Sequence, residues 1–205
     1  MQSFYAKTGK RLFDVGVATV GLLLLSPLLV ALAFLVKLTS AGPVFYRQIR
    51  VGQGGKIFRI AKFRSMRVDA DRYGLPITSA GDPRVTAFGR VLRRLKLDEL
   101  PQLWNVFKGE MSLVGPRPEV PLYVEGYSMS QRQVLLLRPG ITDPASILYR
   151  DEEQLLGVQP DPDRYYREVV LPNKLKLNVE YLSCLSFFYD LSLVLRTISR
   201  ILISK

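Results

Sequence analysis

The most prominent pattern along the chain is a long apolar segment near its N-terminus. From Val15 to Val36, 22 residues pass without a charge, between Asp14 and Lys37. A helix of about 20 apolar residues is long enough to cross the hydrocarbon core of a bilayer, so the pattern predicts a membrane helix over residues 12–38. A signal peptide is the first alternative, although its apolar region normally has only about 7–15 residues.

Two features favour a helix that dips into the membrane and returns over one that crosses it. Ser26-Pro27 lies at the centre of the segment, where the proline removes a hydrogen-bond donor and clashes with the preceding turn. Both flanks are basic, and a crossing helix cannot place both of them on the cytoplasmic side that Lys and Arg prefer. We therefore expect a re-entrant helix broken at Ser26-Pro27, with a crossing helix kinked by proline as the alternative. The basic flanking residues are Lys7, Lys10, Arg11, Lys37, Arg47, Arg50 and Lys56.

After Gly42-Pro43 the hydrophobic pattern changes to short elements. Residues 44–51 and 56–66 flank the turn Gly52-Gln53-Gly54-Gly55, which predicts a β-hairpin. A final amphipathic helix begins at Phe187 and can either lie in the membrane interface or pack on the core. Together these elements predict one domain over residues 1–205, of the α/β class but mostly helical, with a small sheet. Apolar spacing predicts the shorter helices over 88–95, 101–108 and 165–180.

The composition limits the chemistry that the chain can perform. It has 29 Lys and Arg against 18 Asp and Glu, a formal net charge of +11, no His, and Cys184 as its single cysteine. Without His there is no imidazole base and no His-ligated metal, and one cysteine forms neither an internal disulfide nor a cysteine cluster. Catalysis must therefore use carboxylates, Lys, Arg, Tyr, Ser, or a hard cation held by oxygen. The positive charge calls for an anionic partner, which can be nucleic acid, anionic lipid or a phosphorylated small molecule.

Two adjacent carboxylates, Asp98 and Glu99, are the first candidate for chemistry. On one interpretation Asp98 caps the helix that begins near Pro101, and Glu99 favours the positive end of that helix. On the other, a carboxylate surrounded by Arg93, Arg94 and Lys96 keeps a depressed pKa and stays ionised. An ionised carboxylate can act as a nucleophile or as a ligand of Mg²⁺.

Arg117 is the second candidate, because prolines on both sides fix its backbone. A guanidinium presented in this way suits bidentate recognition of phosphate, although an incidental surface arginine in a rigid turn is the alternative. Lys62 and Arg64 occupy alternate positions on one strand face and can add further phosphate contacts. Their segment, 56–66, mixes basic and aromatic residues, so it could also line a nucleic-acid groove or lie against lipid headgroups.

Several long motifs occur in order along nearly the whole chain. With them the chain resembles the bacterial sugar transferases, small monotopic phosphoglycosyl transferases that start glycan assembly on polyprenyl phosphate. The long N-terminal membrane region of the larger members does not precede these motifs, so we expect the minimal catalytic form. The motifs are Lys10-Arg11-Leu12-Phe13-Asp14, Ser26-Pro27, residues 56–66, 97–106 and 108–118, and Arg138-Pro139-Gly140-Ile141-Thr142.

The resemblance implies transfer of a phosphosugar from a UDP-sugar to polyprenyl (undecaprenyl) phosphate, with Mg²⁺ as cofactor. In the family the residue matching Asp98 is the nucleophile, which releases UMP and forms a covalent phosphosugar-aspartate; we also expect Asp98 to ligate the metal. The residue matching Glu99 completes the dyad by managing the proton of the acceptor. The re-entrant helix breaks at the Ser-Pro pair. The residues that match phosphate-binding positions are Arg117, Arg93, Lys62 and Arg64.

The resemblance also implies a place and partners for the protein. We expect it in the bacterial inner membrane with its site on the cytoplasmic face, bound to membrane lipid and not to nucleic acid, and able to work beside downstream glycosyltransferases. Asp143-Pro144-Ala145-Ser146 stands where many members have a Gly-rich run, and Asn178 stands where some have an acidic residue, so the identity of the sugar does not carry over. Two rival hypotheses are a non-catalytic, membrane-tethered polyanion-binding protein and a spanning anchor that recruits other transferases.

Overall fold

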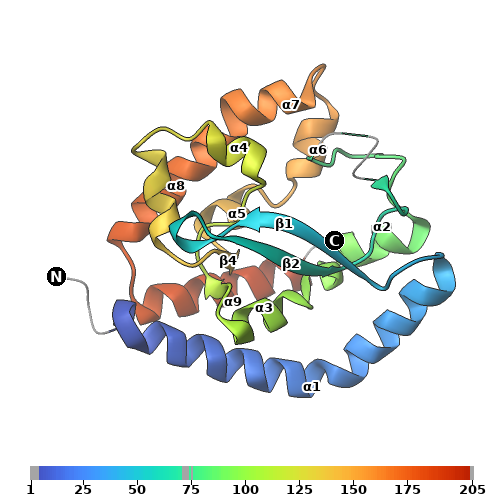
Figure 1. Cartoon of the computed structure of the whole chain (residues 1–205), viewed down its shortest axis with the longest axis horizontal. Coiled ribbons are helices and arrows are strands. Elements are labelled where there is room, and N and C mark those ends of the chain that lie inside the picture. The colour runs from blue at the N-terminus through green and yellow to red at the C-terminus, as the bar shows by residue number, and fades with distance from the viewer. Residues whose placement is uncertain (1–4, 71–73, 75, 204–205) are drawn as a thin grey trace.

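The computed structural model describes residues 5–70, 74 and 76–203. Helices form most of it, and they surround two small sheets, one antiparallel and one parallel (Figure 1). The elements are α1 (Lys10–Thr39), β1 (Phe45–Val51), β2 (Ile57–Phe63), α2 (Ala87–Arg94), α3 (Gln102–Lys108), β3 (Ser112–Val114), α4 (Pro121–Glu125), β4 (Gly140–Thr142), α5 (Pro144–Leu148), α6 (Glu152–Gly157), α7 (Pro162–Tyr165), α8 (Leu171–Ser183) and α9 (Phe187–Ile203).

The long helix α1 bends but does not break. It continues for 30 residues with Pro27 inside it, and its path curves beneath the rest of the molecule (Figure 1). Proline cannot donate to the carbonyl four residues before it, which here is that of Leu23. The Ser26 hydroxyl donates to this same carbonyl at 2.8 Å. The prediction that the helix breaks at Ser26-Pro27 is therefore wrong, because the serine supplies the hydrogen bond that the proline removes.

Most of the apolar surface of α1 is left uncovered by the protein. The helix is long and apolar enough to cross a membrane, yet only 11% of its most apolar stretch is buried. The core helix of a soluble protein would bury one face against its neighbours. An exposed surface of this size and composition suits contact with lipid instead, so the structure is compatible with a monotopic membrane protein. The largest exposed apolar side chains of α1 are Leu12, Val20, Leu23, Leu24, Val30, Phe34 and Leu38.

Both ends of α1 are bonded to the rest of the chain. Near its start, the Lys10 ammonium pairs with the buried carboxylate of Asp190 in α9, which also accepts the Tyr181 hydroxyl at 2.6 Å. At its far end, the guanidinium of Arg64 donates to the carbonyl and the hydroxyl of Ser40, each at 2.6 Å. The helix is therefore fixed against one body at both ends.

The predicted hairpin is confirmed. Strands β1 and β2 pair antiparallel from Phe45 opposite Phe63 to Val51 opposite Ile57. The side-chain amide of Asn105 in α3 donates to the Arg59 carbonyl, and its oxygen accepts from the backbone of the hairpin, each at 2.9 Å. These bonds hold the hairpin against α3, so the register of β2 fixes where Lys62 points.

A two-stranded parallel sheet carries the turn with the Pro-Arg-Pro sequence. Strand β3 pairs with β4, with Val114 opposite Thr142. A Cβ added to Gly115 would lie 2.4 Å from the Arg138 carbonyl oxygen, and one added to Gly140 would lie 2.1 Å from the Gly115 nitrogen. Only glycine allows the two backbones to come this close, so the glycines bring the turn 115–118 beside the residues that follow β4.

The C-terminal half differs in detail from the prediction. The helix expected over 165–180 divides into α7, a wide turn over Tyr166–Val170 and α8, and Pro172 lies in the first turn of α8, where its missing N–H costs little. Helix α9 packs on the core through one face, as one of the two alternatives predicted, and leaves another apolar face exposed. It buries Leu193, while Phe188 and other apolar side chains remain exposed.

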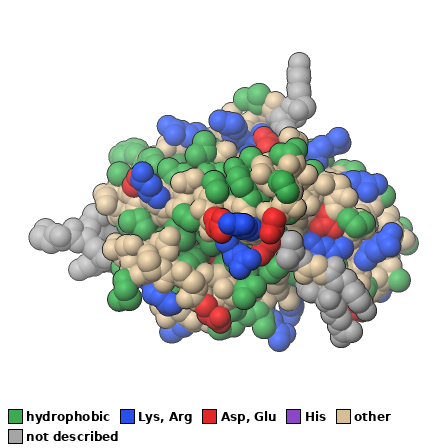
Figure 2. Space-filling view, turned by 90° about the horizontal axis from the view of Figure 1, so that it is seen from above, with side chains coloured by type: hydrophobic (Ala, Val, Ile, Leu, Met, Phe, Trp, Pro, Cys, Tyr) green, Lys and Arg blue, Asp and Glu red, His purple; other side chains and the backbone are tan. Residues whose placement is uncertain are grey.

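The face turned away from α1 has a different character. Seen from above, basic and acidic side chains lie close together in its middle, among apolar and uncharged ones (Figure 2). Exposed ion pairs of this half include Arg164 with Glu168 and Arg167 with Asp163. The apolar side chains lie along α1 and the charges lie on the opposite face, so the α1 side is the one that suits contact with lipid.

Candidate active site

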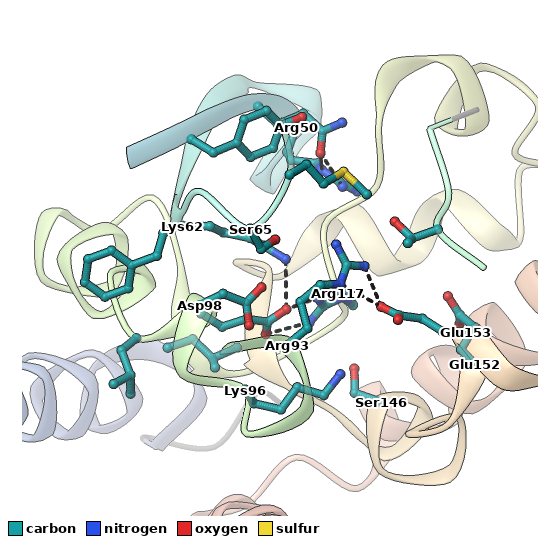
Figure 3. Close-up of a pocket in the computed structure, with 18 of the residues that line it drawn as sticks. Arg50, Lys62, Ser65, Arg93, Lys96, Asp98, Arg117, Ser146, Glu152 and Glu153 are labelled. Carbon is teal, nitrogen blue, oxygen red and sulfur yellow. Dashed lines mark hydrogen bonds and ion pairs between the residues drawn. The ribbon is translucent and has the colours of Figure 1, made fainter. Parts of the chain in front are cut away.

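The predicted site residues come together around one cavity of about 800 Å³. They reach it from separate parts of the chain: the β2 strand and the loop after it, the end of α2, the turn Leu97–Glu99, and the turn after β3 (Figure 3). The cavity is therefore the place where the sequence motifs meet. The predicted residues that line it are Lys62, Arg64, Arg93, Asp98, Glu99 and Arg117.

Asp98 lies in a short 3₁₀ turn between α2 and α3. Lys96 just before it has a φ of 56°, in the left-handed region, and reverses the chain after α2. The side chain of Asp98 caps no helix, since α3 begins without a side-chain cap at Pro101. The interpretation of Asp98 as a helix cap is therefore wrong. Its Oδ1 is buried and has no hydrogen-bond partner among the described residues, which leaves an oxygen available for a ligand in the cavity.

The electrostatics of the two carboxylates differ from the prediction. Burial, followed by the charge of Glu99, raises the pKa of the Asp98 carboxyl above its ordinary value, although Lys62, Arg93 and Lys96 act in the opposite direction. The prediction of a depressed pKa for Asp98 is wrong because burial and the charge of Glu99 outweigh the effect of the surrounding cations. The ionised form of Asp98 is thus less stable than that of an ordinary carboxylate, and carboxyl groups with such shifted pKa values are frequent at reactive sites.

Glu99 holds the depressed pKa instead. Burial would raise the pKa of this carboxyl, but the charges of Arg117 and Lys62, together with a hydrogen bond from Arg117, outweigh burial and hold it well below its usual range. Lys62 Nζ lies 2.8 Å from Glu99 Oε1, and Arg117 Nη1 lies 3.2 Å from Oε2 while its Nη2 bonds Oε1. The carboxylate is therefore clamped on both oxygens by two cations.

The two other predicted cations are also engaged. Arg93 pairs with Glu153, with its Nε 3.1 Å from Oε1. Arg64 is buried and bonds to Ser40 at the end of α1, while its Nε and Nη1 have no partner among the described residues. Arg64 therefore connects the wall of the cavity with the end of the apolar helix.

Sequence reasoning missed a second polar group in the same cavity. Lys174 Nζ lies 2.8 Å from Glu152 Oε2 and 3.9 Å from Glu119 Oε1, and the Tyr166 hydroxyl donates to Glu119 at 2.5 Å. The residues come from separate parts of the chain: Glu119 follows the Pro-Arg-Pro turn, Glu152 lies in an acidic run, and Tyr166 and Lys174 lie in the C-terminal helices. On another side the lining is apolar and comes from α1 and α9, with Leu25, Val194, Ile198 and Ile201.

The residues present fit a magnesium ion that shares its ligands with a phosphorylated substrate. Among the described residues there is no group of three or more Asp, Glu, Cys or His side chains that could hold a metal. Magnesium in proteins is usually bound by one or two carboxylates, substrate phosphates and water. The Oδ1 of Asp98, to which none of the residues that the structure describes is bonded, can supply that one carboxylate oxygen.

Comparison with known proteins decides the family. The sequence profile of the family described as "Bacterial sugar transferase" matches residues 5–204. The chain belongs to the bacterial sugar transferase family. This confirms the resemblance seen in the motifs.

Relatives of this bacterial sugar transferase carry informative names. It is 38% identical over 196 residues to the UDP-N-acetylgalactosamine-undecaprenyl-phosphate N-acetylgalactosaminephosphotransferase of Aeromonas hydrophila, covering 94% of this chain and 43% of the relative. It is 36% identical over 203 residues to the UDP-glucose:undecaprenyl-phosphate glucose-1-phosphate transferase of Escherichia coli K12, covering 96% and 40%. It is 37% identical over 211 residues to the exopolysaccharide production protein ExoY of Rhizobium meliloti, covering 96% and 86%. The chain thus spans less than half of the first two relatives and most of the third.

The clamp around Glu99 generates a prediction about stability. We expect Glu99→Gln to lower the free energy of unfolding by about 1–3 kcal/mol at pH 7, because it leaves the partly buried Lys62 and Arg117 without their anion. Arg117→Met should also destabilise, and the double variant should cost less than the sum by about 1–3 kcal/mol. Because the pKa of Glu99 is lowered on folding, this stabilisation is complete above the unfolded pKa near ~4.3 and is lost as the pH falls through the folded value.

Denaturant unfolding in detergent micelles measures these free energies. Arg164→Met is the control, since it removes an exposed pair with Glu168 and should change stability by no more than about 0.5 kcal/mol. If the changes in the free energy of unfolding caused by Glu99→Gln and Arg117→Met were strictly additive in the double variant, the ion pair between the two residues would be contradicted.

Proposed function

We propose that this protein transfers a sugar 1-phosphate from a UDP-sugar to polyprenyl phosphate in the bacterial inner membrane. The observation that carries the proposal is the buried Asp98 carboxylate, one oxygen of which has no partner among the described residues, in a cavity lined by Lys62, Arg93 and Arg117. The names of the Aeromonas and Escherichia coli relatives describe phosphotransferases that act on UDP-sugars and undecaprenyl phosphate. The cavity lining supports the same chemistry here.

The first step forms a covalent intermediate. A carboxylate oxygen of Asp98 attacks the β-phosphorus of the UDP-sugar, the bond from that phosphorus to the bridging oxygen breaks, and UMP leaves with the electron pair. The phosphosugar is then held on Asp98 as an acyl phosphate. Phosphoryl transfer of this kind needs positioning and positive charge more than it needs a proton donor. The cavity provides both positioning and positive charge without histidine.

The second step passes the phosphosugar to lipid. An oxygen of polyprenyl phosphate attacks the phosphorus of the intermediate, the bond to the Asp98 oxygen breaks, and the carboxylate is restored. Glu99 takes the proton of the acceptor phosphate where one is present. Phosphates that draw Lys62 and Arg117 toward themselves weaken their hold on Glu99 and raise its pKa, which is what a proton acceptor requires.

Magnesium fits beside Asp98 in this scheme. Together with phosphate oxygens of the donor, the Asp98 carboxylate would hold the ion, which offsets the negative charge of the diphosphate. The cations of the protein act independently of it: Lys62 and Arg117 are fixed by Glu99, and Arg93 is fixed by Glu153. Their positions are therefore set before any substrate arrives.

The attachment of α1 supports a re-entrant placement in the membrane. Lys10 at its start bonds to Asp190, and Ser40 at its end bonds to Arg64. Both partners belong to the same body, so a helix that crossed the bilayer would have to pull one of these ends away. The curved middle of α1 then points into one leaflet, the basic flanks stay at the cytoplasmic surface, and the apolar cavity wall from α1 and α9 faces the isoprenoid chain.

The chemistry is tested by the product and by Asp98. With Mg²⁺, undecaprenyl phosphate and a panel of UDP-sugars, we expect the purified protein to release UMP with at least one donor. Asp98→Asn should lower the rate by at least about 10³-fold, because an amide cannot act as the nucleophile, and EDTA should stop turnover of the unmodified protein. Release of UDP, or activity retained by Asp98→Asn, would contradict the mechanism. Chromatography of the nucleotide products gives the answer.

The placement of α1 is tested by cysteine labelling. The native Cys184 is exposed, and a second cysteine introduced by Thr8→Cys marks the region before α1. In cells whose outer membrane has been permeabilised while the inner membrane is intact, we expect a membrane-impermeant maleimide to label neither cysteine. Both cysteines should become labelled once the inner membrane is opened. Labelling of the Thr8→Cys position alone from the outside would show that α1 crosses the membrane.

A further inference from the structure

Asp143 is a completely buried carboxylate that the proposed reaction does not use. Its Oδ2 accepts the backbone N–H of Arg117 at 2.7 Å and the side-chain amide of Asn178 at 3.2 Å. Its Oδ1 accepts the backbone N–H of Ser146. Donors from three segments therefore meet on one carboxylate, and none of the described Lys or Arg side chains forms an ion pair with it.

The parallel sheet explains why Asp143 and Arg117 meet. Strands β3 and β4 end side by side, with Val114 opposite Thr142, so the residues that follow them start at the same edge. Arg117 stands between two prolines, which have no N–H. Its amide is therefore the only backbone donor of the segment 116–118, and Asp143 accepts it.

We propose that Asp143 is a positioning residue for Arg117. By holding the backbone of Arg117 in place, it directs the guanidinium toward Glu99, where Nη1 lies 3.2 Å from Oε2. The path runs from Asn178 on α8 through Asp143 and Arg117 to the carboxylate beside Asp98. The effect on catalysis rests on the proposed function, whereas the effect on the backbone of Arg117 rests on geometry alone.

This contact joins two departures from the family pattern. The loop that begins at Asp143 and the amide at Asn178 were each unexplained in the sequence, and in the structure they are hydrogen-bonded to each other. Asn178 is itself buried. The buried carboxylate of this region thus comes from the loop after β4, and α8 supplies a donor to it.

The chain contains a matched control for Asp143. Asp143-Pro144 begins α5 and Asp161-Pro162 begins α7, and each aspartate accepts the N–H three residues later, that of Ser146 or of Arg164. Serine caps a helix about as well as aspartate, so Asp→Ser preserves either cap. A serine has one oxygen on a shorter side chain, and it cannot serve Ser146 and Arg117 together. Asp161 is exposed and does not line the cavity.

Hydrogen exchange and kinetics test the proposal together. We expect Asp143→Ser to raise the exchange rate of the Arg117 amide, followed by mass spectrometry of peptides that span 116–118, by at least about tenfold relative to the unmodified protein. The turnover number for UMP release should fall by about tenfold to a hundredfold, as displaced catalytic groups do. Asp161→Ser should leave both quantities within about threefold. If Asp143→Ser does not fold, the isosteric Asp143→Asn, which also removes an acceptor oxygen, is measured in the same way.

The exchange rate tests whether Asp143 holds the Arg117 backbone, and the turnover number tests whether this matters for the reaction. Unchanged exchange at Arg117 would overturn the proposal, since Asp143 would then be a cap alone. Faster exchange with turnover within about threefold of the unmodified protein would also overturn it, since Asp143 would then hold the Arg117 backbone without positioning its guanidinium for the reaction. Equal losses in Asp161→Ser would show a general effect of the caps and would also overturn it. An unmodified protein that releases no UMP would reject the proposed function, while the exchange comparison would still decide whether Asp143 holds Arg117.

Discussion

The double ion pair of Glu99 with Lys62 and Arg117 is the interaction on which the site depends. Lys62 comes from the hairpin, Glu99 from the turn after α2, and Arg117 from the turn after β3. A partly buried anion between two partly buried cations is costly to break, so the three segments are held in one arrangement. Because Glu99 takes both cations, Asp98 beside it is left buried, with one oxygen that no other residue in the described part of the chain bonds. One carboxylate is stabilised, and its neighbour is kept available for reaction.

The membrane helix is subject to a second constraint of the same kind. Polar bonds attach both ends of α1 to the body, while its middle exposes apolar side chains and a proline whose hydrogen-bond loss is made good by Ser26. Lipid can cover the exposed surface without separating the ends. The Ser40–Arg64 contact also ties the helix to the cavity wall, so the position of the end of α1 and the shape of the site are connected.

Local pattern was enough to predict much of this structure. The hairpin and the short helix before Asp98 follow from alternation and apolar spacing, and the residues of the cavity follow from the motifs that the chain shares with the family. Three features could not be predicted because they depend on contacts between distant segments. The pKa values of Asp98 and Glu99 have directions that only burial and pairing distances determine. The bond from Asp143 to Arg117 requires the register of β3 and β4, and the Lys174–Glu152 pair requires the packing of α6 against α8.

The most direct test is to look for the phosphosugar on Asp98. The purified protein would be mixed with Mg²⁺ and the UDP-sugar that supports turnover, without polyprenyl phosphate, and its intact mass and peptides would be measured after rapid quenching. The account predicts a mass increase of one phosphosugar, located on the peptide with Asp98, and release of one UMP for each molecule modified. UMP release that requires the lipid acceptor and leaves the protein unmodified would contradict it.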